Sequence, residues 1–271
     1  MDILYISLGV IAVLCAVYLV LIAPVKNERI NAYRSVLYAH RGLHGEGVAE
    51  NSMTAFRRAV EQGYGIELDI RLSSDGQLVV FHDDTLTRVT KIEGRVDSLT
   101  AEELGNIHLL DTEDTVPLFS DVLAMVDGRV PLLVEIKEDA GKYDVSDAAV
   151  EMLKSYTGPY IIESFNPLSL GNVAKKITEV PRGILSQNYL LDKKYRKPLY
   201  FILGALLMNR VCKPSFVAYN HRDASSVSLR TVRRLFNTVT FAWTVRSPEE
   251  EAKARAAGFD GIIFEGYIPE K

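Results

Sequence analysis

Acidic side chains interrupt two stretches whose other residues have the composition of buried strands. The stretch YGIELDIRLSSDGQLVVFHDD (64–84) carries Glu67 and Asp69 two residues apart, and a second stretch, VEIK, carries Glu135. Residues two apart in a strand point to the same face of a sheet. We therefore expect three carboxylates, from two strands, to point into one site.

Carboxylates crowded in this way repel one another. Either their pKa values rise or a cation lies among them. A site that offers only oxygen ligands favours a hard divalent ion over zinc. The sequence therefore predicts that Ca²⁺ or Mg²⁺ lies among Glu67, Asp69 and Glu135.

Two histidines and two cationic side chains accompany these acids. His40 and Arg41 end one apolar run, His82 follows another, and Lys137 shares a strand face with Glu135. An imidazole near its ordinary pKa serves as general base or general acid at neutral pH, and His40 and His82 can approach one bound group from different sides. The metal, Arg41 and Lys137 give three positive centres, which suits an anionic phosphate oxygen. We interpret the set as an arrangement for hydrolysing a phosphodiester.

Short β-rich runs alternate with helix-period stretches from residue 36 onward, which indicates βαβ units and a parallel sheet. The candidate strands are 36–40, 65–71, 78–82, 131–137, 160–165, 182–186, 216–220, 240–245 and 260–265. Only 65–71 and 78–82 lack a helix between them, so 78–82 is expected to fold back as a β-hairpin arm after the second strand. The others predict an α/β fold, a (β/α)8 TIM barrel over 36–271, with its chemistry at the C-terminal ends of the strands.

The N-terminal residues have a different character. Residues 3–23 carry no charge and reach the roughly 20 residues that a helix needs to cross a bilayer. We expect 1–24 to be an uncleaved transmembrane anchor, because a signal peptide would begin with a basic region and a core helix would not be apolar on every face. The positive residues that follow the run are Lys26, Arg29 and Arg34. The positive-inside rule then puts the domain in the cytoplasm, on a chain that crosses the cell membrane once.

The segment 25–35 is expected to be a short linker between anchor and barrel. Its reach is about 40 Å at full extension, which keeps the active site near the membrane. The net charge of -4 and the pI of 5.8 argue against a nucleic-acid partner. The only cysteines are Cys15 and Cys212, and the first lies inside the apolar run, so a disulfide framework is not expected.

Six separated motifs, spread over nearly everything after residue 36, match one known family. They are AHRG (39–42), ENSMTAFRRAVEQG (50–63), IELDIRLSSDGQLVVFHDDTLTR (66–88), VEIK (134–137), SFNP (164–167) and WTV (243–245). In these motifs the chain resembles the glycerophosphodiester phosphodiesterases, which are TIM barrels. The resemblance implies hydrolysis to sn-glycerol 3-phosphate and an alcohol, in which the glycerol hydroxyl of the substrate attacks phosphorus before water does.

The resemblance also assigns roles to single residues. Its implied metal ligands are Glu67, Asp69 and Glu135, its acid and base are His40 and His82, and its phosphate-binding groups are Arg41 and Lys137. Glu50 and Asn51 are implied to support the first histidine. Trp243 is implied to line the substrate cleft, although packing between strands and helices accounts for it equally well.

Two carboxylates depart from the family pattern. The last strand reads IIFEGY where the family often has Thr-Asp and then Pro, so Glu265 stands near the place of that acid. Glu163, in YIIESFNP, has no assigned role. Asp83 and Asp84 are interpreted as residues that serve turn geometry and solvation. The histidines expected to be hydrogen-bonded structural residues are His44, His108 and His221.

Several alternatives stay open at the level of sequence. In 193–213 an apolar run, 199–209, lies between basic clusters, which is typical of a helix in the membrane interface or of an outer helix packed on the barrel. In the first case the substrate would include lysolipid as well as soluble glycerophosphodiesters. Phosphoinositide-type phospholipases and sphingomyelinase-like phosphodiesterases share the barrel and the paired histidines. A membrane-tethered binding module without activity is the alternative from another class.

Overall fold

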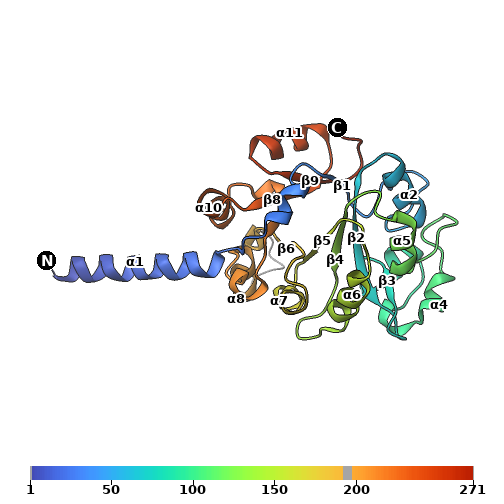
Figure 1. The fold of residues 1–271 in the computed structure, drawn as a ribbon, viewed down its shortest axis with the longest axis horizontal. Helices are drawn as coiled ribbons and strands as arrows, with labels where there is room; N and C mark the ends of the chain where they lie inside the picture. The colour runs from blue at the N-terminus through green and yellow to red at the C-terminus, as the bar shows by residue number, and fades with distance from the viewer. Residues whose placement is uncertain (1, 192–196, 271) are drawn as a thin grey trace.

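The predicted barrel is present in the computed structural model, which describes residues 2–191 and 197–270 (Figure 1). Its parallel strands are β1 (Leu37–Ala39), β2 (Gly65–Leu72), β4 (Leu132–Ile136), β5 (Tyr160–Ser164), β6 (Arg182–Ser186), β7 (Phe216–Asn220), β8 (Val239–Val245) and β9 (Gly261–Phe264). They follow the order β1-β9-β8-β7-β6-β5-β4-β2, and the pairing of β1 with β2 closes the barrel. The eight strands and their closure confirm the predicted TIM barrel.

The hairpin arm is also confirmed. Strand β3 (Leu78–Val80) runs antiparallel to β2, with Val80 opposite Ile70. A separate apolar cluster fixes the arm, in which Val79 and Phe81 are buried with residues of the following short helices. These helices are α3 (Thr87–Thr90) and α4 (Ala101–Gly105). The arm therefore holds His82, which follows it directly, on a packed support.

Helices cover the outside of the barrel (Figure 1). The longer ones are α2 (Met53–Glu61), α5 (Phe119–Val126), α6 (Asp144–Lys154), α7 (Pro167–Lys176), α10 (Val227–Phe236) and α11 (Pro248–Ala256), and two short ones are α8 (Pro198–Gly204) and α9 (Asn209–Cys212). Ile66, Leu68 and Ile70 of β2 are buried in the outer apolar layer that the helices complete. The residues that alternate with them therefore point into the barrel.

The barrel interior is packed with apolar rings toward the N-terminal ends of the strands. Tyr38, Phe216 and Phe241 are buried there, and the centroid of the Phe241 ring lies 5.0 Å from that of Phe216 and 5.8 Å from that of Tyr38. Gly183 and Gly261 leave the space for two of these rings, since a Cβ on them would lie 2.0 Å from Phe216 and 2.4 Å from Phe241. Further along the strands the inward positions become acidic. The floor of the barrel is thus closed, and its mouth is polar.

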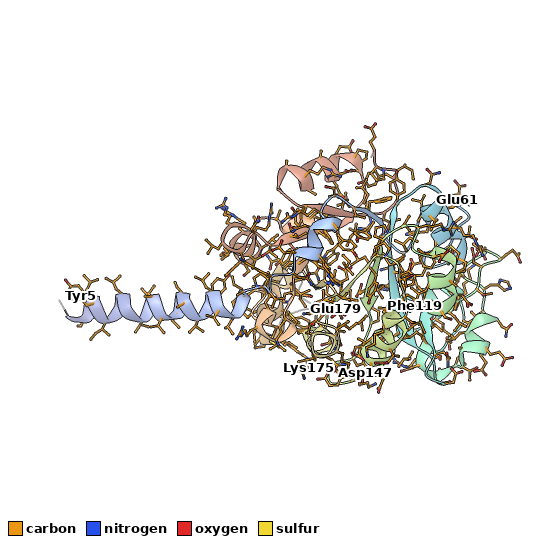
Figure 2. All side chains as sticks on the ribbon, in the orientation of Figure 1. Tyr5, Glu61, Phe119, Asp147, Lys175 and Glu179 are labelled. Atoms are coloured by element: carbon orange, nitrogen blue, oxygen red, sulfur yellow. The ribbon has the colours of Figure 1, made fainter. Side chains whose placement is uncertain are left out.

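Helix α1 (Asp2–Ile22) is joined to the domain more closely than expected. Over Ile3–Ile22 it is long and apolar enough to cross a membrane, and its side chains project freely along most of its length (Figure 2). Its last turn is different, because Ile22 is buried and its carbonyl accepts a hydrogen bond from Asn209 Nδ2 at 2.8 Å. The Tyr18 hydroxyl lies 2.9 Å from the hydroxyl of Ser228. The end of the apolar helix is therefore part of the folded domain.

The segment 25–35, expected to be a short linker, contains a 3-10 helix. Glu28–Tyr33 form a 3-10 helix, and Ile30 is 5% exposed within the apolar cluster that fills the barrel interior. The Tyr33 hydroxyl donates to the carbonyl of Tyr160, the first residue of β5, at 3.2 Å. The segment closes the N-terminal end of the barrel, because burying Ile30 there is more favourable than leaving it in water. The segment is therefore shorter than the limit of about 40 Å that full extension would allow.

Candidate active site

A cavity of about 300 Å³ opens at the C-terminal ends of the strands. Seven of the predicted site residues line it, namely His40, Arg41, Glu67, His82, Glu135, Lys137 and Trp243, and so do Glu163 and His221. Asp69 lies beneath Lys137 and is fully buried. Lining residues that the sequence did not single out include Phe165, Asn220, Arg222 and Arg246. They also lie at or just beyond strand ends. Asn220 is the last residue of β7 (Phe216–Asn220), so the rule that alternate residues of a strand share a face, which located the acids, could have found it.

The three predicted metal ligands do meet. Glu67, Asp69 and Glu135 are buried, and one carboxylate oxygen of each lies within 4.8 Å of the others. Register brings them together, because Asp69 is paired with Glu135 across β2 and β4. Oxygens at this spacing around a common point are what a hard divalent cation requires. The described cluster is therefore able to hold a metal ion.

The electrostatics of the cluster call for added positive charge. Burial raises the pKa of Glu67 well above its usual range, and Asp69 and Glu135 add to the rise. Burial likewise raises the pKa of Glu135 to about 7. Burial opposes the charge of Asp69 as well, but Lys137, His82 and Arg41 together outweigh burial, so the pKa of Asp69 lies well below normal. Ionisation of Glu67 and Glu135 is therefore unfavourable until a cation binds among the carboxylates.

Lys137 stands at the centre of this group. Its Nζ lies 2.6 Å from Glu135 Oε1 and 3.0 Å from Asp69 Oδ1. Burial opposes its charge, but the two carboxylates outweigh burial and raise the pKa of Lys137. Glu163 is paired with Glu135 in the register of β4 and β5, and burial raises its pKa well above the usual range. We therefore take Glu163, whose role the sequence left open, as a neutral carboxyl group in the wall of the cavity.

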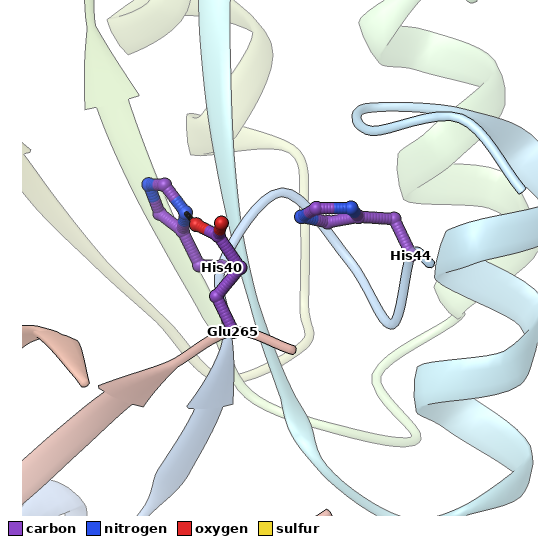
Figure 3. A group of neighbouring side chains, drawn as sticks. All are labelled: His40, His44 and Glu265. Carbon is purple, nitrogen blue, oxygen red and sulfur yellow. Dashed lines mark hydrogen bonds and ion pairs between the residues drawn. The ribbon is translucent and has the colours of Figure 1, made fainter. Parts of the chain in front are cut away.

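His40 is held by Glu265, the carboxylate at the departure from the family pattern (Figure 3). Its Nδ1 lies 2.6 Å from Glu265 Oε2, and its Nε2 lies 4.0 Å from Glu67 Oε2. Burial lowers the pKa of His40 to about 4, whereas the contact with His40 lowers the pKa of Glu265 to about 2. At neutral pH an ionised Glu265 therefore accepts the Nδ1 proton of a neutral imidazole. This assigns the free lone pair to Nε2, on the metal-ligand side.

His44, expected to be a hydrogen-bonded structural residue, lies beside Glu265. Among the described residues no hydrogen-bond partner reaches its buried Nε2. The His44 ring points toward Glu265 from the side opposite His40 (Figure 3), and one ligand atom of each residue lies within 4.8 Å of the others. Burial lowers the pKa of His44, so the ring is neutral beside the ionised carboxylate.

Replacing Glu265 by Gln is expected to lower kcat/KM by about 10- to 100-fold, part of the 10²- to 10⁴-fold that general acid–base catalysis supplies. The amide keeps the shape but removes the charge that favours the imidazolium form of His40. The pKa of His40 should fall further below about 4, so the acid limb of the pH profile moves to lower pH. The pH dependence of kcat/KM checks this. An unshifted acid limb with an unchanged plateau would show that Glu265 does not act through His40.

His82 is held from two sides. Its Nδ1 lies 2.5 Å from Asp83 Oδ1, and its carbonyl accepts hydrogen bonds from Arg71 Nε at 2.9 Å and Nη2 at 2.7 Å. Asp84 pairs with Arg71 at 2.5 Å. Asp83 and Asp84, interpreted as turn and solvation residues, thus also pair with groups that hold His82. Burial lowers the pKa of His82, whereas Asp69 and Asp83 favour its charged form.

Glu50 and Asn51, which the family resemblance implied would support His40, form their described side-chain hydrogen bonds with other residues. The Asn51 amide donates to Asp69 Oδ2 at 2.8 Å, and Glu50 accepts from Arg41 Nη1 at 2.8 Å. Glu50 also accepts from Arg88 at 2.6 Å, which in turn reaches Asp83. The turn of the chain after β1 explains the difference, because Arg41 and Asn51 adopt left-handed backbone angles, with φ of 55° and 54°. Their side chains therefore face the acids of β2.

Arg41 is placed by this same turn. Its backbone N–H donates to Glu67 Oε2 at 2.8 Å, and its Nε lies 3.5 Å from Asp69 Oδ2. Across the cavity, the rings of Trp243 and Phe165 meet edge to face with centroids 5.4 Å apart. Lys137 Nζ lies 5.8 Å from the centroid of the Phe165 ring. The cavity thus has a charged wall, which suits a phosphate, and an aromatic wall.

A TIM barrel with clustered acids, two histidines and two cations at its C-terminal mouth defines a barrel hydrolase that acts on phosphate esters. The model of the glycerophosphoryl diester phosphodiesterase family matches residues 40–266. The chain belongs to this family and is a phosphoric diester hydrolase. The match covers every site residue described above.

Individual relatives agree with this assignment. A glycerophosphodiester phosphodiesterase of Caldanaerobacter subterraneus is 30% identical over 250 residues, which cover 85% of this chain and 93% of that protein. The solved structure of a glycerophosphodiester phosphodiesterase of Thermotoga maritima has a TM-score of 0.66 at 26% identity and covers 85% of this chain and 94% of its own. A phosphodiesterase of Oleispira antarctica, solved with the product sn-glycerol-3-phosphate, has the same fold, with a TM-score of 0.72 at 21% identity over 86% of this chain and 94% of its own.

Proposed function

We propose that this protein hydrolyses glycerophosphodiesters to sn-glycerol 3-phosphate and an alcohol, and that a divalent cation and two histidines carry out the reaction. The observation that carries the proposal is the meeting of three buried carboxylates between His40 and His82, beside Arg41 and Lys137. The relative from Caldanaerobacter subterraneus, named for this activity, supports the reaction. The product bound to the phosphodiesterase of Oleispira antarctica supports sn-glycerol 3-phosphate as the product here.

Glu67, Asp69 and Glu135 are the groups that would hold the cation, Ca²⁺ or Mg²⁺. The donor set fits such an ion, because all three residues offer oxygen ligands and the pKa values of Glu67 and Glu135 are raised despite the neighbouring Arg41 and Lys137. When bound, the ion supplies Lewis-acid stabilisation of the charge on the phosphoryl oxygens. Lys137 and Arg41 then bind the remaining phosphate charge from the side of β4 and β1.

His40 acts as the general base in this proposal and His82 as the general acid. Neutral His40 donates its Nδ1 proton in a hydrogen bond to Glu265, and its Nε2 accepts a proton from the attacking hydroxyl. Burial lowers the pKa of His82, but Asp69 and Asp83 favour its charged form, so it can carry the proton that the departing alcohol oxygen takes up. Trp243 and Phe165 exclude water from the glycerol side of the cavity.

The distinguishing experiment is product identification with the full chain in detergent, with glycerophosphocholine as substrate and Mg²⁺ or Ca²⁺ present. Equal amounts of sn-glycerol 3-phosphate and choline are expected. Glycerol with phosphocholine would mean that the other phosphodiester bond is cut. Turnover of inositol phospholipid or sphingomyelin without turnover of glycerophosphocholine would favour the rival phosphodiesterase classes.

We also propose that α1 anchors the enzyme, with residues 36–271 as the catalytic domain on the cytoplasmic side of the cell membrane. The support is the exposed apolar surface of Ile3–Ile22 and the positive residues that follow it. A fluorescent protein fused to the C-terminus is expected to fluoresce at the membrane, and an alkaline phosphatase fusion at the same place is expected to be inactive. The reverse pattern, or recovery of the enzyme in the soluble fraction, would contradict the proposed topology.

A further inference from the structure

We propose that a cluster of arginines beside the membrane helix binds the phosphate head group of an anionic phospholipid and so holds the domain against the membrane. The proposal builds on the anchoring by α1 and goes beyond the phosphodiester chemistry, on which it does not depend. The cluster lines a hollow of about 580 Å³ between α10 and the segments that precede β1 and β9. Its members are Arg34, Arg230, Arg233 and Arg234.

The positive charge of this hollow is only partly balanced. Asp260 is the one carboxylate among the described residues that line it. One Asp260 oxygen pairs with Arg34, and the other accepts a hydrogen bond from the backbone N–H of Thr240 at 2.8 Å. The stretch 224–248, which includes all of α10, contains no Asp or Glu. The hollow therefore keeps a surplus of positive charge, which an anion would offset.

The guanidinium of Arg233 is already held in position. Its Nη2 donates to the carbonyl of Ala257 at 2.5 Å, and its central carbon lies 5.3 Å from the centroid of the Phe259 ring. Gly258 leaves room for it, because a Cβ at this position would lie 2.0 Å from Nη2. Binding an anion here would cost less side-chain ordering than binding by a free arginine.

The other two arginines of α10 share its exposed face. Arg230 and Arg234 are exposed and lie four residues apart, a spacing at which like charges repel on a helix. The pair therefore does not serve the stability of α10. Val227 and Leu235 lie on the same face at helical spacing and are 72% and 63% exposed. Cations between exposed apolar side chains are typical of helices that lie in a membrane interface.

Helix α10 begins at the depth where α1 would leave the bilayer. The Tyr18 hydroxyl, one turn before the end of α1 at Ile22, lies 2.9 Å from the hydroxyl of Ser228 in the first turn of α10. Figure 1 shows α10 on the side of the domain from which α1 projects. The cytoplasmic leaflet is anionic and attracts basic segments next to a membrane helix. This placement favours a lipid head group over a nucleic acid or an acidic protein as the source of the anion.

Helix α8 marks the same side of the domain with exposed apolar side chains. Leu199 and Phe201 are 54% and 53% exposed on this helix, which Figure 1 shows beside the C-terminal end of α1. The basic residues at 193–196, which were expected to flank this apolar run, lie outside the described residues. The side chains of α8 and the arginines of α10 would then meet the membrane surface together.

The test is lipid binding by the full-length protein in a neutral detergent, measured by native mass spectrometry as phosphatidylglycerol or phosphatidylcholine is added. Each cation near an anionic surface contributes about fivefold, so the three arginines of α10 should give wild-type protein a preference for phosphatidylglycerol of about 100-fold. Arg230→Gln combined with Arg234→Gln should lower this preference to about fivefold. Arg57→Gln combined with Arg58→Gln is the matched control, because both are exposed on α2, far from α1 (Figure 1).

Equal Tm values would show that both double variants are folded. Added salt should narrow the wild-type preference, because salt screens exposed charges. The same preference in wild-type protein and the Arg230, Arg234 variant overturns the proposal, as does a wild-type protein without any preference. Displacement of phosphatidylglycerol by inorganic phosphate would assign the cluster to a soluble anion instead. None of these measurements involves turnover, so failure of the proposed reaction would leave the lipid preference in place.

Discussion

Replacing Glu67 by Gln is expected to lower kcat on glycerophosphocholine by at least about 10³-fold while making the metal-free protein more stable. The catalytic loss follows from removing a ligand of the cation, whose stabilisation of transition-state charge contributes several kcal/mol. The gain in stability follows from the raised pKa of Glu67, because burial and the neighbouring acids disfavour its charge in the folded state. A neutral amide of the same shape removes that penalty.

The two effects are measured separately. Steady-state kinetics over a range of Mg²⁺ or Ca²⁺ gives kcat, and thermal unfolding in EDTA gives Tm, for which we expect a rise of about 2–4 °C for each kcal/mol gained in a domain of this size. Glu151→Gln is the control, because the side chain of Glu151 is 70% exposed on α6 and pairs only with Lys154. Retention of wild-type kcat by Glu67→Gln would show that Glu67 is not a ligand of the cation. A fall in both kcat and Tm would indicate a structural role instead.

His40→Ala and His82→Ala should each lower kcat/KM by about 10²- to 10⁴-fold, which is the range for loss of a general acid or base. The loss of kcat/KM in the double variant should be far smaller than the product of the two single losses, because the two imidazoles serve one proton-transfer cycle. His108→Ala is the matched control, since His108 is exposed and lies away from the cavity.

Substrates with a better leaving group separate the two roles. A p-nitrophenyl phosphodiester needs no proton on its leaving oxygen, so it should restore much of the rate of His82→Ala and little of the rate of His40→Ala. Recovery of both variants to the same degree would contradict the assignment of His40 as base and His82 as acid. Recovery of His40→Ala alone would reverse the roles.

Much of the fold was predictable because strand and helix periods are local properties of the chain. Short β-rich runs between helix-period stretches located every strand of the barrel, and the short connection SSDGQ identified the hairpin arm. The inward position of Glu67, Asp69 and Glu135 followed from the same parity. Where neighbouring strands are paired in register, the sequence therefore also predicted which side chains would meet.

The contacts that support the histidines were not predictable in this way. His40 and Glu265 are 225 positions apart, and they meet only because β9 pairs with β1 to close the barrel. Arg41 and Glu50 meet through left-handed backbone angles in a loop, which side-chain periodicity does not report. The 3-10 helix over Glu28–Tyr33 was missed because a six-residue segment with one buried Ile30 carries no periodic signal.

The account depends on one cation among Glu67, Asp69 and Glu135, and removal and return of that cation is its most direct test. Wild-type protein is stripped with EDTA, and release of sn-glycerol 3-phosphate from glycerophosphocholine is followed while Mg²⁺ or Ca²⁺ is added back. We predict no measurable release in EDTA and a saturable return of activity that fits one ion for each chain. Undiminished release in excess EDTA would contradict the metal site and, with it, the proposed reaction.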